Sequence, residues 1–243
     1  MTTQDTGYAA SALAAVPAAG DRRAMPMPAR LTYYYGPMQC GKSTLALQID
    51  HNHARQGRHG LLLTRYDRSG APRISSRIGV GRQAVEVADV TDVRELVRGR
   101  WAVGQRVDYL IVDEAQFLTA AHVEQLADLV DCSHVDVYAF GLVTDFRGRL
   151  FPGSQRLFEL ADAVIAIQVE VLCWCGRPGL LNARVVDGRV TREGDTVVVA
   201  DTAAAAAPSE DTAEVHYQVL CRHHHRTGDL GPHHPVPGQL TLD

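Results

Sequence analysis

Short apolar runs separated by helical periodicity divide the first two thirds of the chain into alternating predicted strands and helices. The apolar runs are rich in β-branched and aromatic residues, and several of them end at Gly, Pro or Asp, which is typical of buried strands that enter turns. They cover residues 31–35, 60–64, 107–112, 135–140 and 164–167. Segments that suit helices lie between them, at residues 42–55, 92–97, 120–130 and 154–160. This alternation predicts an α/β fold with a mostly parallel sheet that has helices on both faces.

The pattern changes after residue 167. Short β-like runs at residues 197–199 and 217–220 are separated by glycines and by an alanine tract at 203–207. We therefore predict four regions: a disordered N-terminal extension at 1–29, the α/β domain at 30–170, a smaller module at 171–226 and a disordered tail at 227–243.

Composition narrows the function classes. The net charge is −4, so no global basic surface for nucleic acid is predicted. No apolar run approaches the ~20 residues of a membrane span, and the first residues lack the features of a secretory signal. Five cysteines without an export signal do not indicate a disulfide framework. We expect a cytoplasmic protein that binds neither membrane nor nucleic acid.

One loop matches the pattern of a phosphate-binding P-loop. Such a loop turns backbone N–H groups toward phosphate oxygens, and the following helix adds its positive N-terminal end. Lysine reaches the β- and γ-phosphates, and the serine hydroxyl binds Mg²⁺. Lys42 is the only lysine of the chain, although arginine is frequent. The loop lies between a predicted strand and a predicted helix, and it consists of Gly36, Pro37, Met38, Gln39, Cys40, Gly41, Lys42 and Ser43.

Two acidic residues, Asp113 and Glu114, directly follow the strand predicted at 107–112. Asp113 is the expected partner of Ser43 in holding magnesium. Adjacent side chains at a strand end point to opposite sides, so Glu114 is placed to accept a proton from an attacking hydroxyl or to orient a water. The motif alone leaves a kinase and an ATPase both open, and the alternative without function is a solvated acidic loop.

Three cysteines and one histidine in the smaller module form a candidate zinc site. A closed set of four ligands of this kind is typical of structural zinc. The C-x-C spacing of the first pair is tighter than the usual C-x₂₋₄-C, and the alternative is a set of buried free thiols beside solvated histidines. The candidate ligands are Cys173, Cys175, Cys221 and His224.

Four motifs, in this order, resemble those of the zinc-containing type II thymidine kinases, across about residues 31–226. They are GPMQCGKST at 36–44, which adds Thr44 to the phosphate loop, DEAQF at 113–117, GLVTDFRGRLFPGS at 141–154, and the ending Y-x-V-x-C-R-x-H at 217–224. The resemblance implies a P-loop domain with a zinc-ribbon "lasso" domain, and a kinase that transfers the ATP γ-phosphate to the 5′-hydroxyl of thymidine.

The resemblance also implies roles for particular residues. Glu114 is the expected catalytic base, and Ser43 and Asp113 organise magnesium. Arg68 lies near the phosphates. The thymine base is enclosed by Met38, Phe117, Leu142, Phe146 and Tyr217. Further expectations are ATP and Mg²⁺ as cofactors, structural Zn²⁺, a homotetramer, and dTTP as a feedback inhibitor.

Two other functions fit parts of the sequence. A DE pair followed by Gln also suits a nucleic-acid-dependent ATPase, and a zinc ribbon with a degenerate nucleotide site would be an interaction module. The acidic net charge opposes the first, and the intact set of Lys42, Ser43, Asp113 and Glu114 opposes the second.

Overall fold

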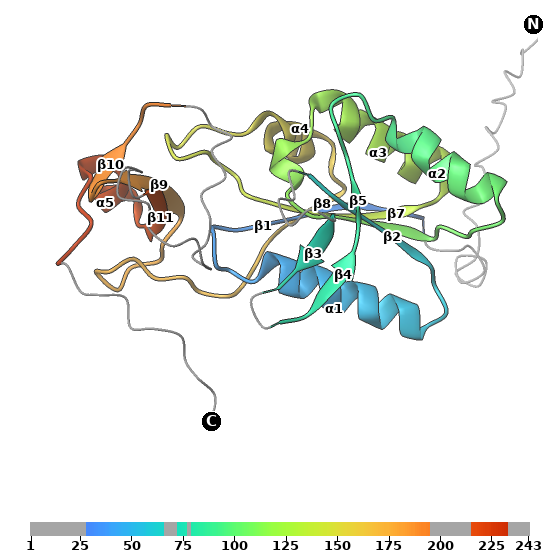
Figure 1. Cartoon of the computed structure of the whole chain (residues 1–243), viewed down its shortest axis with the longest axis horizontal. Helices are drawn as coiled ribbons and strands as arrows, with labels where there is room; N and C mark the ends of the chain where they lie inside the picture. Colours follow the sequence, from blue (N-terminus) through green and yellow to red (C-terminus); the bar gives the residue numbers. More distant parts are fainter. Residues whose placement is uncertain (1–27, 66–71, 77–78, 195–214, 233–243) are drawn as a thin grey trace, which may run out of the picture.

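The computed structural model describes residues 28–65, 72–76, 79–194 and 215–232. Its largest element is a six-stranded sheet with the strand order β5–β2–β6–β7–β1–β8 (Figure 1). Every strand pair in it is parallel, so the carboxyl ends of all six strands lie along one edge. The strands are β1 (Leu31–Tyr35), β2 (Gly60–Thr64), β5 (Val85–Glu86), β6 (Tyr109–Val112), β7 (Asp136–Gly141) and β8 (Ala163–Ala166).

Helices cover both faces of this sheet, as the alternating pattern predicted. Figure 1 shows α1 (Lys42–Arg55) on one face, with α2 (Val93–Ala102), α3 (Ala120–Ser133) and α4 (Pro152–Leu160) on the other. Alternate residues of the central strands belong to separate cores: Leu62 of β2 belongs to the cluster that contains Leu47 of α1, whereas Leu63 belongs to the cluster that contains Leu126 of α3. Both faces are therefore apolar, which explains why the strands are continuous hydrophobic runs.

Most predicted elements are present, with shifted ends. The strand expected from residue 107 begins at Tyr109, and the helix expected to end at residue 97 continues to Ala102. In the α/β part of the chain, three short strands were not predicted: β3 (Arg73–Ser75), β4 (Gly81–Gln83) and β5. β3 and β4 form an antiparallel hairpin in which Ile74 is the buried residue. Among the described residues, no helix is both long and apolar enough to cross a membrane.

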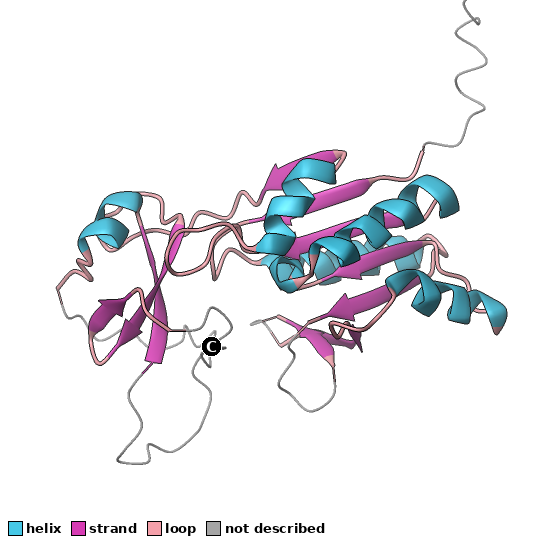
Figure 2. Cartoon of the chain, turned by 90° about the horizontal axis from the view of Figure 1, so that it is seen from above, coloured by secondary structure: helices cyan, strands magenta, loops and turns pink. Residues whose placement is uncertain are grey.

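The second part of the chain forms a small antiparallel sheet of order β10–β9–β11, followed by a short helix. The elements are β9 (Leu181–Val186), β10 (Arg189–Thr191), β11 (Val215–Leu220) and α5 (Arg222–Thr227). Figure 2 shows this module beside one end of the main sheet. The predicted boundary between residues 170 and 171 falls between β8 and β9 and stays a prediction. Residues 197–199 and 203–207, and almost all of the predicted extension, lie outside the described residues.

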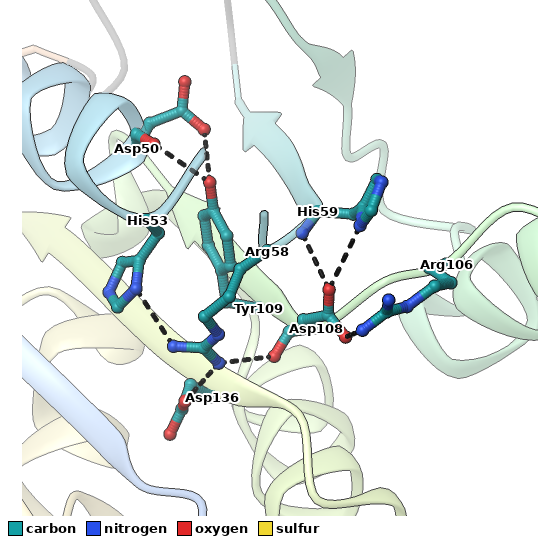
Figure 3. Close-up of polar contacts among 8 residues, drawn as sticks. All are labelled: Asp50, His53, Arg58, His59, Arg106, Asp108, Tyr109 and Asp136. Atoms are coloured by element: carbon teal, nitrogen blue, oxygen red, sulfur yellow. Dashed lines mark hydrogen bonds and ion pairs between the residues drawn. The ribbon is translucent and has the colours of Figure 1, made fainter. Parts of the chain in front are cut away.

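A polar cluster fixes the opposite, amino-terminal edge of the sheet (Figure 3). The guanidinium of Arg58 donates to Asp136 Oδ2 at 2.6 Å and to the Asp108 carbonyl at 3.0 Å. The buried Tyr109 hydroxyl donates to Asp50 Oδ1 of α1 at 2.8 Å. A second part of the cluster joins His59 and Arg106 to the Asp108 carboxylate. These contacts attach the end of α1 and the start of β6 to each other, far from the carboxyl edge.

The first turn of α2 is capped by the side chain of Asp92, and the contribution of this cap can be tested. Asp92 accepts hydrogen bonds from the backbone N–H groups of Arg94 and Glu95, at 2.9 and 3.3 Å. The Arg94 guanidinium, together with these N–H groups, lowers the pKa of Asp92 from its ordinary 3.8 to about 2. The ionised carboxylate is therefore the stabilising form.

We expect Asp92→Ala to lower the free energy of unfolding by about 1 kcal/mol at neutral pH, because a helix N-cap is lost. Since the folded-state pKa is depressed, the difference from wild type should be complete above pH 4 and should shrink as the pH falls toward about 2. Urea unfolding at several pH values measures both. Asp131→Ala, at an exposed position of α3, is the control and should show no comparable loss.

Candidate functional site

The predicted phosphate loop curls tightly between β1 and α1. Gln39 and Gly41 have left-handed backbone conformations, with φ of 70° and 82°. A side chain at Gly36 would place its Cβ 2.5 Å from Cys40 Sγ, so only glycine fits there. Gly41 is the N-cap of α1, and its carbonyl accepts the N–H of Leu45 at 3.0 Å. The loop therefore leads directly into the positive end of a 14-residue helix.

Lys42 and Ser43, the first residues of α1, have different partners. The Lys42 ammonium donates to the carbonyl of Pro37 at 2.8 Å and to that of Gly36 at 3.3 Å, so it folds back over the loop. The Ser43 hydroxyl donates to Asp113 Oδ2 at 2.8 Å, across 70 positions of sequence. The serine and the aspartate predicted to share a magnesium ion are thus in direct contact.

Asp113 and Glu114 stand where β6 ends. Asp113 is buried, and its burial, followed by the nearby charge of Glu114, raises the pKa of its carboxyl group. Glu114 is half-buried and has a φ of 53°, a conformation that is uncommon outside glycine. This backbone turn sends the two adjacent carboxylates in different directions: Asp113 toward Ser43, and Glu114 toward Gln116.

Gln116 links Glu114 to the end of β7. Its side-chain amide donates to Glu114 Oε2 at 2.5 Å, and its Oε1 accepts the N–H of Leu142 at 3.0 Å. The Leu142 carbonyl in turn accepts from the hydroxyls of Tyr33, at 2.9 Å, and Ser154. Both backbone groups of Leu142 are therefore held by side chains. Gln116 lies within the DEAQF motif, but no role was predicted for it.

The five predicted base-contacting residues lie on elements that meet at the carboxyl edge. Met38 is in the phosphate loop, Phe117 ends the 3₁₀ turn η2 (Ala115–Phe117), Leu142 and Phe146 follow β7, and Tyr217 is on β11. Phe117 is half-buried and packs edge-to-face on Phe151. The Phe146 ring is buried, with the guanidinium of Arg147 at 4.8 Å and that of Arg184 at 5.6 Å from its centroid. Arg68 lies outside the described residues.

The small module touches the phosphate loop directly. The side-chain oxygen of Asn182, a buried residue of β9, accepts the backbone N–H of Met38 at 2.9 Å. A second contact joins the buried His225 of α5 to the Phe146 carbonyl, 2.9 Å from Nε2. Neither contact could be predicted from the sequence, because the partners are 144 and 79 positions apart.

The four predicted zinc ligands come together in the small module. Their ligand atoms, three sulfurs and one imidazole nitrogen, all lie within 4.8 Å of one another. His224 Nδ1 is 3.3 Å from Cys173 Sγ and 3.6 Å from Cys221 Sγ. The N–H of His224 holds the pKa of the Cys221 thiol below its usual value, whereas burial raises that of Cys173. Three thiols and an imidazole in this arrangement fit a tetrahedral structural zinc ion.

Comparison with a family model and with known sequences gives one consistent result. The family model described as "Thymidine kinase" matches residues 29–225. A thymidine kinase of Cutibacterium acnes is 51% identical over 203 residues, covering 84% of this chain and 91% of the relative. A thymidine kinase of Streptomyces coelicolor is 53% identical over 196 residues, covering 81% of this chain and 88% of the relative. A more distant relative, the thymidine kinase of Ruegeria pomeroyi, is 39% identical and is covered over 98% of its length.

The metal site can be tested with the cysteines of the chain. Cys221→Ala and His224→Ala each remove one of four ligands, so we expect both variants to lose bound zinc during dialysis against a weak chelator. Cys132→Ala, at an exposed cysteine of α3, should keep about one zinc ion per chain, as in wild type. Metal analysis of the dialysed proteins measures this. Equal zinc in all variants would contradict the assignment.

Proposed function

This chain belongs to the thymidine kinase family, and we propose that it transfers the γ-phosphoryl group of ATP to the 5′-hydroxyl of thymidine. The oxygen–phosphorus bond to the nucleoside forms, the bond between the β- and γ-phosphates breaks, and the products are dTMP and ADP. The observation that carries this proposal is the arrangement of Ser43, Asp113 and Glu114, which places two carboxylates with different partners beside a phosphate loop.

ATP would be held by the loop of residues 36–44. Its N–H groups and the N-terminal end of α1 suit the phosphates. The Lys42 ammonium donates to the carbonyls of Gly36 and Pro37 and would exchange these hydrogen bonds for contacts with phosphate oxygens. Magnesium, when bound, neutralises charge on the phosphates, and Ser43 and Asp113 are the residues that would hold it. Arg68 remains a predicted phosphate ligand.

Glu114 would act as the general base. A carboxylate suits this role if it is held within hydrogen-bond reach of the acceptor hydroxyl. The hydrogen bond from Gln116 supports the role, because it restricts the side chain without neutralising its charge. The same Gln116 holds Leu142, so the base and one wall of the predicted thymine site share a support.

Thymine would lie among Met38, Phe117, Leu142, Phe146 and Tyr217. Flat apolar side chains suit recognition of a pyrimidine ring. The position of these residues around the carboxyl edge supports the proposal for four of them. The Phe146 ring is buried and has two guanidinium groups beside it, so we propose that it supports the wall of the pocket.

Zinc would have a structural role in the small module, because its four candidate ligands leave no open position for a substrate. The homotetramer, the inhibition by dTTP and the cytoplasmic location remain expectations from the family resemblance and the composition.

The first test is formation of dTMP from thymidine and Mg²⁺-ATP by the purified chain and by Glu114→Gln. We expect the variant to lose about 10²–10⁴-fold in kcat, because a general base contributes that much to proton transfer. Glu95→Gln, at an exposed glutamate of α2 whose ion pair with Arg98 is a surface one, is the control and should keep wild-type activity.

Thymidine-free ATP hydrolysis, with and without added DNA or RNA, is measured in parallel. ATP consumption that is independent of thymidine and stimulated by nucleic acid would replace the kinase proposal with the nucleic-acid-dependent ATPase.

A further inference from the structure

Two neighbouring histidines of α5 have separate partners. His224 lies 3.3 Å from Cys173 Sγ and belongs to the candidate metal cluster. His225 is 2% exposed, and its Nε2 lies 2.9 Å from the carbonyl oxygen of Phe146. Consecutive residues of a helix point about 100° apart, so one short helix contacts both the cluster and the loop that follows β7.

The His225 contact has a defined direction. A carbonyl oxygen can only accept a hydrogen bond, so Nε2 carries the hydrogen and donates it. Because the imidazole is buried, loss of this donor would leave the Phe146 carbonyl without its partner. The contact is therefore of a kind that holds a loop in one place.

A second set of contacts joins the small module to the loop that follows β7. Arg147, the residue after Phe146, donates through Nε to the Arg192 carbonyl at 3.0 Å and through its guanidinium to the Gly194 carbonyl. The Arg192 guanidinium donates to the carbonyl of His225. His225 therefore forms hydrogen bonds through both its side chain and its backbone. The small module thus contacts two consecutive residues of the loop, Phe146 and Arg147.

Hydrogen bonds within residues 143–151 hold this loop together, so a displacement of one residue shifts the rest of the loop. The Asp145 carboxylate accepts the N–H groups of Arg147 and Arg149, both at 2.9 Å. At its far end the N–H of Phe151 donates to the carbonyl of Val143 at 3.2 Å. Val143 follows Leu142, the predicted wall of the thymine site.

We propose that His225 is a positioning residue that couples the cysteine–histidine cluster to residues 143–151, so that a filled metal site fixes the wall of the nucleoside pocket. The coupling runs from the metal ligand His224 through the backbone of α5 to His225 and then to Phe146. It rests on the proposed function only for its effect on thymidine binding; the mechanical link between cluster and loop stands without it.

The test compares His225→Phe, which keeps a ring but removes the donor, with His225→Gln, which keeps an N–H donor. His223→Phe is the matched control, because His223 is exposed on the same helix and its ring lies against that of His224. In the full-length chain, three quantities are measured for each: bound zinc, hydrogen exchange of the amides at 143–151, and KM and kcat for thymidine.

We expect His225→Phe to keep its zinc but to exchange the loop amides faster and to raise the KM for thymidine on the order of tenfold, the factor that corresponds to about 1.4 kcal/mol. The kcat should fall less than KM rises, His225→Gln should recover most of the loss, and His223→Phe should match wild type. Removal of zinc should accelerate exchange of the loop in wild type and add little in His225→Phe.

Unchanged exchange of the loop amides in His225→Phe would overturn the proposal, because His225 would then not hold the loop. Loss of zinc from His225→Phe would also overturn it, because His225 would then support the metal site alone. If the wild-type chain does not phosphorylate thymidine, the proposed function fails, while the exchange and zinc measurements still decide the coupling.

Discussion

The order of three central strands constrains the whole site. β7 lies between β6 and β1, so the Ser43–Asp113 hydrogen bond at 2.8 Å must span the end of β7. At the same edge β7 ends in Gly141, where a Cβ would lie only 2.8 Å from Gln116 Oε1. The absent side chain lets Gln116 lie against the end of β7, where its Oε1 accepts the N–H of Leu142. A bulkier residue there would displace Gln116, which also donates to Glu114.

Much of the fold followed from the sequence because the main sheet is buried on both faces. Continuous apolar runs mark its long strands, and the regions between them are long enough to show helical periodicity. β9 was missed for a physical reason: Asn182 and Arg184 interrupt its apolar pattern, yet Asn182 is buried because Met38 supplies its hydrogen bond. α5 is six residues long and rich in histidine, so its sequence has no apolar face from which a helix could be predicted.

The residues of the candidate site also fall into those that the sequence could predict and those that it could not. The phosphate loop, the acidic pair and the four candidate metal ligands could be proposed from the sequence because their chemistry demands certain residue types at certain spacings. Gln116, Asn182 and His225 could not, because the side chain of each contacts a backbone group elsewhere in the fold: Leu142 N–H, Met38 N–H and the Phe146 carbonyl, respectively. Any donor or acceptor of similar reach satisfies such a contact, and the partner is set by the tertiary fold. Motifs identify groups that perform chemistry, whereas the groups that hold them in place are visible only in the structure.

Lys42 has a consequence outside catalysis. It is the only lysine of the chain, so the phosphate loop carries the sole side-chain amine available to acylating reagents, to lysine-specific proteases or to enzymatic acetylation. Its ammonium lies against two carbonyls of the loop, where a bound phosphate would shield it. Covalent labelling of this single amine can therefore serve as a direct gauge of nucleotide occupancy, free of the background that surface lysines create in most proteins.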